Sequence, residues 1–335
     1  MSANLPRIAV LLGDPAGVGP EMGVKLLARE ANRQSAQVLL LAAPSVLAGG
    51  ERIAQQPLDV VRIRPGDPLH FEPGKVTHLV LDEPPGGTAD LGSCSVAAGA
   101  AVLDALSRAT ALAAAGEVQG IVFAPLNKHS LRLAGMTEED ELRYMQTLFG
   151  VRGFTCEFNI TDQLWTSRVT SHVPLREVAA LITPEAVAAA VHIIDQALRR
   201  AGVAQPRIAV SGLNPHAGDN GSIGREEIEI IAPAVIRLRR DGKAASGPWS
   251  PDTVFIAARR GDFDAVVSMY HDQGQIAMKL MGFERGVTLH GGLPVPVATS
   301  ASGSAFDIAG QGIARIEGLQ HAFDLCVRMA TRARG

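Results

Sequence analysis

Cysteine is scarce in this sequence, with three residues among 335. Cys94, Cys156 and Cys326 are far apart and form neither a CxxC pair nor another metal-ligand spacing. Such a sparse, odd-numbered set argues against a disulfide framework and is typical of a reducing compartment. Aromatic residues make up only 4% of the chain, so the core must be built mainly from aliphatic side chains.

Strong charge of one sign and long apolar runs are also missing. The net charge is −3, so we expect neither nucleic acid nor a membrane surface as a partner. Residues 1–12 lack the basic start and apolar stretch of a secretory signal. We also find no window that approaches the roughly 20 apolar residues of a membrane span. We therefore expect a cytoplasmic protein.

The chain does contain a regular alternation of apolar strands and helical segments. We expect strands at 7–12, 38–42, 120–124, 167–170, 208–211 and 265–268, and helices at 20–30, 93–115, 184–201, 225–241 and 319–331. This order predicts an α/β protein with parallel, helix-covered sheets. Since one core rarely grows beyond about 250–300 residues, we expect two α/β/α lobes. The predicted first lobe is 1–130 plus 300–335, and the second is 131–299.

Polar motifs follow five of the expected strands. These segments are Gly13–Gly19, Ala124–Lys128, Thr170–His172, Gly212–His216 and Met269–Gly274. In open parallel sheets, ligands bind beyond the carboxyl ends of the strands, so the segments could converge on one cleft.

Three of the nine histidines share one placement, in the first polar turn after a buried strand: His172, His216 and His271. Neutral imidazole is a common ligand of catalytic divalent metals, and three protein ligands leave room for a substrate. A hydrogen-bonded loop histidine is the alternative for each, because their spacing is too long for a local metal motif.

The Gly13–Gly19 turn matches neither a Walker loop nor a GxGxxG fingerprint. Asp14 adds negative charge and Pro15 removes a donor where a pyrophosphate would sit. We therefore exclude a standard Rossmann site. Asp14, Gly17 and Asn214 remain candidate cofactor contacts, with a tight structural turn as the alternative for the first two.

Charged residues near these motifs offer further candidates. Lys128 and Lys279 could carry catalytic charge, with a solvated surface lysine as the alternative. Asp272 and Asp252 could orient a ligand histidine or accept a proton. For Asp252, which follows a Ser-Pro pair, a helix cap is the favoured interpretation.

Several motifs together resemble the 4-hydroxythreonine-4-phosphate dehydrogenase family. They are Gly13-Asp-Pro-Ala-Gly-Val-Gly-Pro-Glu21, Gly212-Leu-Asn-Pro-His-Ala-Gly218, Met269-Tyr-His-Asp-Gln-Gly274 and Gly282-Phe-Glu-Arg-Gly286. The resemblance implies a fold like that of isocitrate and isopropylmalate dehydrogenases and a homodimer with a shared active site. It also implies that His172, His216 and His271, drawn from both subunits, hold one divalent ion, and that Lys279 meets the substrate.

The reaction implied by the resemblance is oxidation of a hydroxy acid by NAD or NADP to a β-keto acid, which then loses carbon dioxide. Three imidazoles would suit Zn, Co, Ni or Fe, and a carboxylate-rich substrate could bring in Mg or Mn.

The phosphate-reading part of the family pattern is altered in this sequence. Glu139 and Asp140 replace a His-Thr pair, Thr288 replaces an asparagine and Val297 replaces an arginine. Losing a bidentate arginine removes the best side-chain ligand for phosphate, and carboxylates would repel a dianion. The alternative for residues 136–143 is a capped helix start, with Thr137 as the cap.

These changes lead us to expect an unphosphorylated substrate, such as the cis-dihydrodiol carboxylate used by relatives that degrade terephthalate. The alternatives are 4-hydroxythreonine 4-phosphate, or a related phosphorylated four-carbon hydroxy acid. Two other classes stay open: a non-catalytic ligand-binding protein on the same fold, and an acyl transferase that would not need the histidines.

Overall fold

The computed structural model describes residues 5–84, 90–161, 164–282 and 285–333. The chain divides into two compact units, of which unit 1 comprises 1–152 and 293–335 and unit 2 comprises 153–292. Phe283 and Glu284 of the fourth family motif lie outside the described residues.

Unit 1 is built on parallel strands in the order β3-β4-β2-β1-β5-β12. Their bounds are β1 Arg7–Leu11, β2 Gln37–Ala42, β3 Val60–Ile63, β4 Val76–Val80, β5 Gly120–Phe123 and β12 Val297–Ser300. Ile8 to Leu11 are at most 1% exposed, as expected for a central strand covered on both faces.

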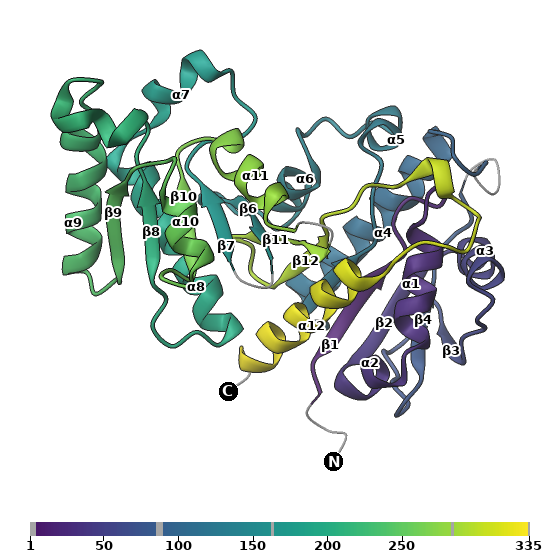
Figure 1. Ribbon diagram of the computed structural model, residues 1–335. Coiled ribbons are helices and arrows are strands. Elements are labelled where there is room, and N and C mark those ends of the chain that lie inside the picture. Colours follow the sequence, from purple (N-terminus) through teal and green to yellow (C-terminus); the bar gives the residue numbers. More distant parts are fainter. Residues whose placement is uncertain (1–4, 85–89, 162–163, 283–284, 334–335) are drawn as a thin grey trace. The chain divides into compact units, whose positions relative to one another are not determined.

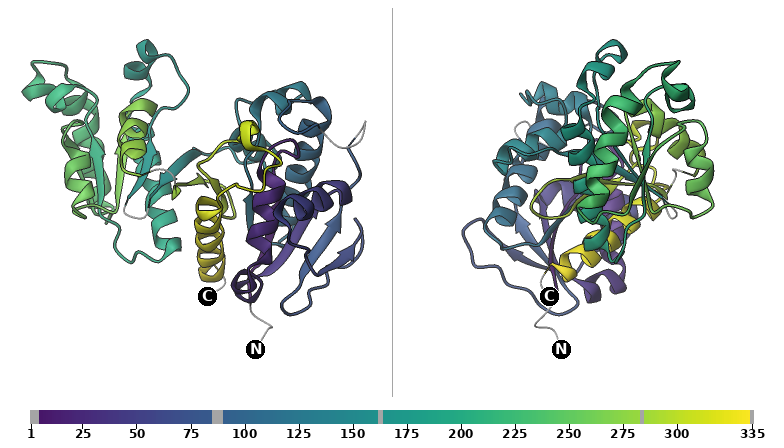
Figure 2. Two further views of the ribbon diagram at one scale, coloured as in Figure 1. Left: turned by 45° about the vertical axis from the view of Figure 1, so that its right-hand side comes forward. Right: turned by 90° about the vertical axis from the view of Figure 1, so that its left-hand side faces the viewer.

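The helices of unit 1 cover both faces of this sheet (Figure 1). They are α1 Gly19–Ala28, α2 Glu30–Ser35, α3 Pro44–Ala54, α4 Val96–Ala114, α5 Lys128–Leu133, α6 Glu141–Leu148 and α12 Glu317–Arg332, with the short turn η4 at Phe306–Ile308. Helix α4 packs Val102 and Leu106 on Ala9 and Leu11 of β1 in one large core. Figure 2 shows α12 alongside α1.

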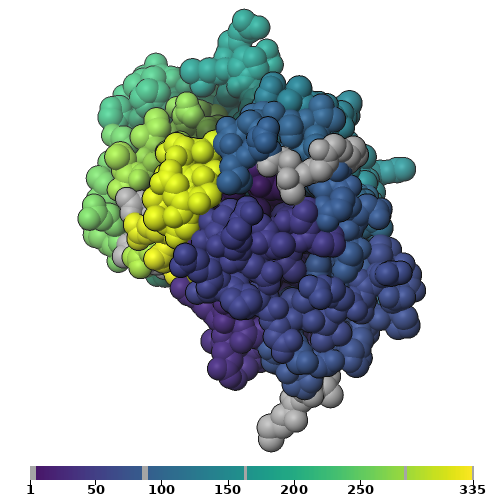
Figure 3. All heavy atoms as spheres, turned by 90° about the vertical axis from the view of Figure 1, so that its right-hand side faces the viewer, coloured from purple at the N-terminus to yellow at the C-terminus, as the bar shows by residue number. Residues whose placement is uncertain are grey.

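The C-terminal helix fastens the end of the chain to its beginning within unit 1. Gln320 on α12 accepts a hydrogen bond from Arg29 and exchanges two with Asn32. In the space-filling view of Figure 3, yellow C-terminal residues lie against purple N-terminal ones.

Unit 2 has the strand order β11-β6-β7-β10-β8-β9. The strands are β6 Cys156–Ile160, β7 Trp165–Arg168, β8 Ile208–Ser211, β9 Ala245–Trp249, β10 Ala265–Ser268 and β11 Val287–Gly291. Strand β6 is antiparallel to both β11 and β7, whereas β7, β10, β8 and β9 are parallel.

The helical segments of unit 2 include one irregular stretch beside the parallel strands. They are α7 Leu175–Leu181, α8 Pro184–Ala201, η1 Pro215–Gly221, the π-helix η2 Glu227–Ile231, α9 Ala232–Arg240, α10 Val254–Arg259 and α11 His271–Leu280. Helices α10 and α11 bury Val254, Ala258 and Met278 against Ala209 and Val266 of the sheet.

The unit boundaries differ from the predicted lobes of 1–130 plus 300–335 and 131–299. Residues 131–152 and 293–299 belong to unit 1. The physical reason is core packing, since Leu142 and Met145 of α6 and Val297 of β12 complete the unit 1 core.

Helix α4 is long and apolar enough to cross a membrane by length and composition, contrary to our expectation that no segment would be. Its apolar face is occupied within unit 1, where Val102, Leu106 and Ala109 are buried in the core. Buried core helices commonly share this length and composition, so α4 is a core helix here.

Candidate active site

Three histidine-bearing segments of unit 2 leave three neighbouring strands. Strand β10 lies between β7 and β8 and is parallel to both. His172 follows β7, His271 opens α11 directly after β10, and His216 lies in η1 after β8. The structure thus brings these three segments to one edge of the unit 2 sheet, whereas Gly13–Gly19 and Ala124–Lys128 lie in unit 1.

His271 is held by its neighbour in sequence. Its Nδ1 lies 2.7 Å from Oδ1 of Asp272, and the ring centroids of His271 and His172 are 5.5 Å apart. If Nδ1 carries the proton that Asp272 accepts, the Nε2 lone pair is available to a metal ion. Asp272 is therefore placed where it could orient the ring of His271, and its role stays a prediction.

His216 lies on an unusual stretch of backbone. His216, Ala217, Asp219 and Asn220 all have positive φ angles between 42° and 54°, and Gly218 between them has 81°. Consecutive left-handed residues other than glycine are unfavourable, so neighbouring groups must hold the loop in place.

The three histidines are suitable ligands for a divalent metal, although their ring nitrogens are not close together within one chain. Within the described part of unit 2, the ring nitrogens of His172, His216 and His271 do not lie within 4.8 Å of one another. Imidazole nitrogen is the right ligand type for a transition metal.

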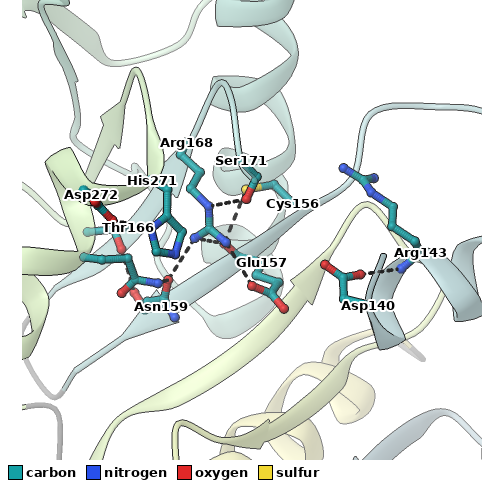
Figure 4. A network of polar contacts seen from close by, with 11 residues as sticks. Asp140, Arg143, Cys156, Glu157, Asn159, Thr166, Arg168, Ser171, His271 and Asp272 are labelled. Carbon is teal, nitrogen blue, oxygen red and sulfur yellow. Dashed lines mark hydrogen bonds and ion pairs between the residues drawn. The ribbon is translucent and has the colours of Figure 1, made fainter. Parts of the chain in front are cut away.

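A buried arginine network, which sequence reasoning missed, supports the end of β7 (Figure 4). Arg168 is 4% exposed and donates to Oγ of Ser171 at 2.8 Å, to Oε2 of Glu157 at 2.9 Å and to Oδ1 of Asn159 at 3.0 Å. Asn159 also accepts from Gln275 of α11 at 2.7 Å. The signal available in the sequence was a charged residue inside an otherwise strand-like run.

Some predicted substrate residues have structural roles. Val297 is fully buried in the unit 1 core, where it packs with Ile121 and does not face solvent. Asp140 is the N-cap of α6 and accepts from the Arg143 amide at 2.9 Å, so the cap is Asp140 and not Thr137. Glu139 is exposed beside it.

Thr288 lies within β11, opposite Asn159 of β6, and is half-buried. Substrate binding by the Thr288 hydroxyl stays a prediction.

The candidate cofactor residues also make structural contacts. Asp14 is 0% exposed, and its Oδ1 accepts from the Ala16 amide at 2.8 Å; burial raises the pKa of Asp14. A side chain at Gly17 would collide with the Ser304 carbonyl. Asn214 donates to Glu226 and Glu227. These contacts favour the tight-turn interpretation of the Gly13–Gly19 loop.

The remaining charged candidates are exposed. Lys128 is the first residue of α5, and Lys279 is in the last turn of α11. Asp252 precedes α10, whose N-cap is Thr253, and its Oδ1 accepts from Ser250 Oγ at 2.6 Å. That hydrogen bond lowers the pKa of Asp252.

Unit 1 contains a cavity of about 270 Å³ beyond the ends of β1, β2 and β4. Its walls are apolar side chains such as Leu41, Val46 and Val102, and Asp82 and Glu83 contribute carboxylates. The cavity is therefore mainly apolar, with acidic residues in its lining.

Comparison with known proteins decides the family. The sequence profile described as pyridoxal phosphate biosynthetic protein PdxA matches residues 34–326. The chain belongs to this family. A protein of Pseudomonas aeruginosa named "Putative 4-hydroxythreonine-4-phosphate dehydrogenase 2" is 50% identical over 330 residues, covering 97% of both chains. D-threonate 4-phosphate dehydrogenase of Salmonella typhimurium is 38% identical over 96% of this chain and 98% of its own.

Solved structures of the PdxA family agree with this assignment. The 4-hydroxythreonine-4-phosphate dehydrogenase of Klebsiella pneumoniae is 36% identical, with a TM-score of 0.82 over 99% of this chain and 100% of its own. A terephthalate 1,2-cis-dihydrodiol dehydrogenase of Burkholderia xenovorans is 28% identical, with a TM-score of 0.70 over 96% of this chain and 98% of its own. The predicted family, two-lobed dehydrogenase fold and oxidoreductase activity on a CH–OH group are therefore confirmed.

Proposed function

We propose that this PdxA-family protein is a metal-dependent, NAD(P)-linked dehydrogenase of a phosphorylated four-carbon hydroxy acid. The product would be a β-keto acid that loses carbon dioxide. The names of its relatives support this substrate class, with 4-hydroxythreonine 4-phosphate and D-threonate 4-phosphate as the first candidates. The observation that carries the proposal is the placement of His172, His216 and His271 after three adjacent strands.

This proposal replaces our expectation of an unphosphorylated dihydrodiol and of a role in aromatic degradation. The terephthalate-related structure is less similar than those of the phosphate-using relatives. Two of the sequence changes behind that expectation have structural roles within unit 1, because Val297 fills the core and Asp140 caps α6.

A divalent ion bound by the three histidines would act as a Lewis acid on the substrate hydroxyl and on the oxyanion left by decarboxylation. A bound NAD or NADP would accept the hydride of the carbinol carbon, and the hydroxyl proton would pass to solvent. Loss of carbon dioxide would then leave the electron pair of the broken C–C bond on the α-carbon, which would take up a proton from solvent.

The residues of this chain would orient the groups that react. Asp272 fixes the ring of His271 through Nδ1. Lys279 is eight residues further along α11, which at 1.5 Å per residue is about 12 Å along the helix axis. We therefore propose that Lys279 offsets charge at the far end of the substrate or at the site of a second subunit.

We further propose that two subunits share each site. This accounts for the open arrangement of the three histidine rings in one chain.

NADH or NADPH formation on a substrate panel tests the proposal. The panel contains 4-hydroxythreonine 4-phosphate, D-threonate 4-phosphate, their unphosphorylated forms and a cis-dihydrodiol carboxylate, each with and without Zn²⁺, Co²⁺ or Mg²⁺. We expect metal-dependent turnover of a phosphorylated acid and its collapse in His216→Ala. Turnover of the dihydrodiol alone would refute the phosphorylated substrate. Full activity of the His216→Ala enzyme would refute the metal site.

A further inference from the structure

The loop that carries His216 is assembled around one buried carboxylate, that of Glu227. Glu227 is 2% exposed and opens the π-helix η2. Its Oε1 accepts from the backbone amides of Leu213 and Asn214, both at 2.7 Å, and its Oε2 accepts from Nδ2 of Asn214 at 2.9 Å. One side chain thus satisfies three donors of the segment that leads into His216.

Two glycines of the same loop leave space for this carboxylate. A side chain at Gly218 would come within 2.7 Å of Glu227 Oε2, and one at Gly212 within 3.0 Å of Oε1. The left-handed run from His216 to Asn220 therefore packs directly around Glu227. The π-helix η2 at this point is consistent with a functional role, since short π-helical segments recur at functional sites.

Gln273 connects this loop to the segment that carries His271. Its Nε2 donates to the Gly212 carbonyl at 2.9 Å, and its Oε1 accepts from the Met269 amide at 2.7 Å. The ends of β8 and β10 are therefore tied by one side chain, which links the Glu227 loop to the segment of His271.

We propose that Glu227 is a positioning residue that sets the conformation of the His216 loop, and that Gln273 fixes this loop relative to His271. The inference rests on the proposed metal site, but neither residue is proposed to touch the ion. A carboxylate is required at 227 because three N–H donors converge on its two oxygens. A glutamine amide keeps only one oxygen and would turn an N–H group towards a donor in place of the other.

The test compares Glu227→Gln with Glu229→Gln, the same substitution on the same helical segment. Glu229 is more than half exposed and pairs with Arg225 four residues away, so it is the matched control. Affinity is measured by calorimetry with Zn²⁺, and coordination by the visible spectrum of the Co²⁺-loaded enzyme. Hydrogen exchange of the metal-free protein at residues 212–221 reports the loop directly.

We expect Glu227→Gln to bind Zn²⁺ about 10- to 100-fold more weakly, to shift the Co²⁺ bands and to speed exchange at the Leu213 and Asn214 amides. Glu229→Gln should match the unmodified protein in all three measurements. Gln273→Met should also weaken Zn²⁺ binding. If Glu227→Gln does not fold, Glu227→Asp decides, because it keeps the charge but is too short to reach every donor.

The outcomes separate this inference from the proposed function. Unchanged exchange, affinity and Co²⁺ spectrum in Glu227→Gln, with binding abolished in His216→Ala, would overturn the positioning role alone. Zn²⁺ binding that His216→Ala leaves intact would overturn the proposed metal site. Faster exchange in metal-free Glu227→Gln without any change in Zn²⁺ affinity would reduce Glu227 to a purely structural residue and overturn the proposal.

Discussion

Asp140 has a structural role that the sequence left open between a helix cap and a substrate contact. It begins α6 and accepts from the Arg143 amide, which is the usual geometry of an N-cap. From the sequence, the same carboxylate could equally have faced a substrate.

Removing this cap should destabilise the protein in a measurable way. We expect Asp140→Ala to lower the free energy of unfolding by about 1 kcal/mol, because a helix amide loses its acceptor. Asp140→Asn should retain most of the stability, since asparagine caps nearly as well. Urea unfolding followed by circular dichroism gives both values. The interpretation fails if Asp140→Ala costs no more than Glu139→Ala, the exposed neighbour.

His78 on β4 should make stability depend on pH. The ring is fully buried, its Nε2 faces the Ala42 carbonyl at 2.9 Å, and burial lowers the pKa of His78 below 6.5. As pH falls below 6.5, the unfolded chain takes up a proton that the folded histidine does not. Stability that is complete at neutral pH is therefore lost progressively towards the lowered folded-state pKa.

We expect His78→Gln to flatten this dependence. The unmodified protein should lose up to about 1.4 kcal/mol per pH unit in that window, the limit for one proton. Urea unfolding at pH 7.5 and 5.5 measures the loss, with exposed His70→Gln as the control. A slope that His78→Gln leaves unchanged would assign the effect to other groups.

Among the helices, two glycines should respond in opposite ways to substitution by alanine, one losing stability and the other gaining it. A side chain at Gly99 of α4 would lie 1.9 Å from the Ser130 carbonyl, because α4 packs closely on α5. A side chain at Gly49 of α3 would meet nothing within 4 Å.

Gly99→Ala should therefore destabilise the protein by about 1–3 kcal/mol through overpacking. Gly49→Ala should stabilise it by up to about 1 kcal/mol, because alanine restricts the unfolded chain. Thermal unfolding of both variants under one condition is the measurement. Equal shifts would contradict the close approach of α4 and α5.

The elements also show what the sequence could and could not predict. The sequence predicts the bounds of α8, β8 and β10 to the residue, because residues that break regular structure flank their apolar runs. The segment 225–241 was predicted as one helix but contains a π-turn before α9. Pro233 lacks the amide that a continuous helix needs at that turn, and this proline is the sequence signal for the break.

The combination of parallel and antiparallel strand pairing in unit 2 cannot be predicted from local sequence patterns. Strand β6 contains Glu157 and Asn159, whose burial depends on Arg168 from another strand, so its sequence does not read as a buried strand. Likewise, the three histidine segments could be assigned to strand ends, but the order β7-β10-β8 that makes them neighbours is a tertiary property. The hydrogen bonds of Glu227 reach residues 14 and 13 positions away, so no local pattern predicts them.

At the scale of the whole molecule, a shared active site predicts complementation between inactive variants. His216→Ala and His271→Ala should each be inactive as homodimers. If the two ligands of one site come from different subunits, a mixed dimer contains one site with both histidines and one with neither.

Mixing the two variants by joint refolding should therefore restore about a quarter of the unmodified activity, by random pairing of subunits. The matched control mixes His216→Ala with a variant that also lacks His216 and carries a purification tag. No recovery in the test mixture would place both histidines in the same subunit's site.

The placement of unit 2 within the chain has a consequence for synthesis. Residues 153–292 are translated between β5 and β12, which pair side by side in unit 1. At about 5–20 residues per second, the ribosome needs on the order of 10 s to make that insert. During this interval β5 is an unpaired edge strand of the nascent first unit. Such an edge is prone to pair with other chains, so we expect chaperones to bind it until β12 has been synthesised.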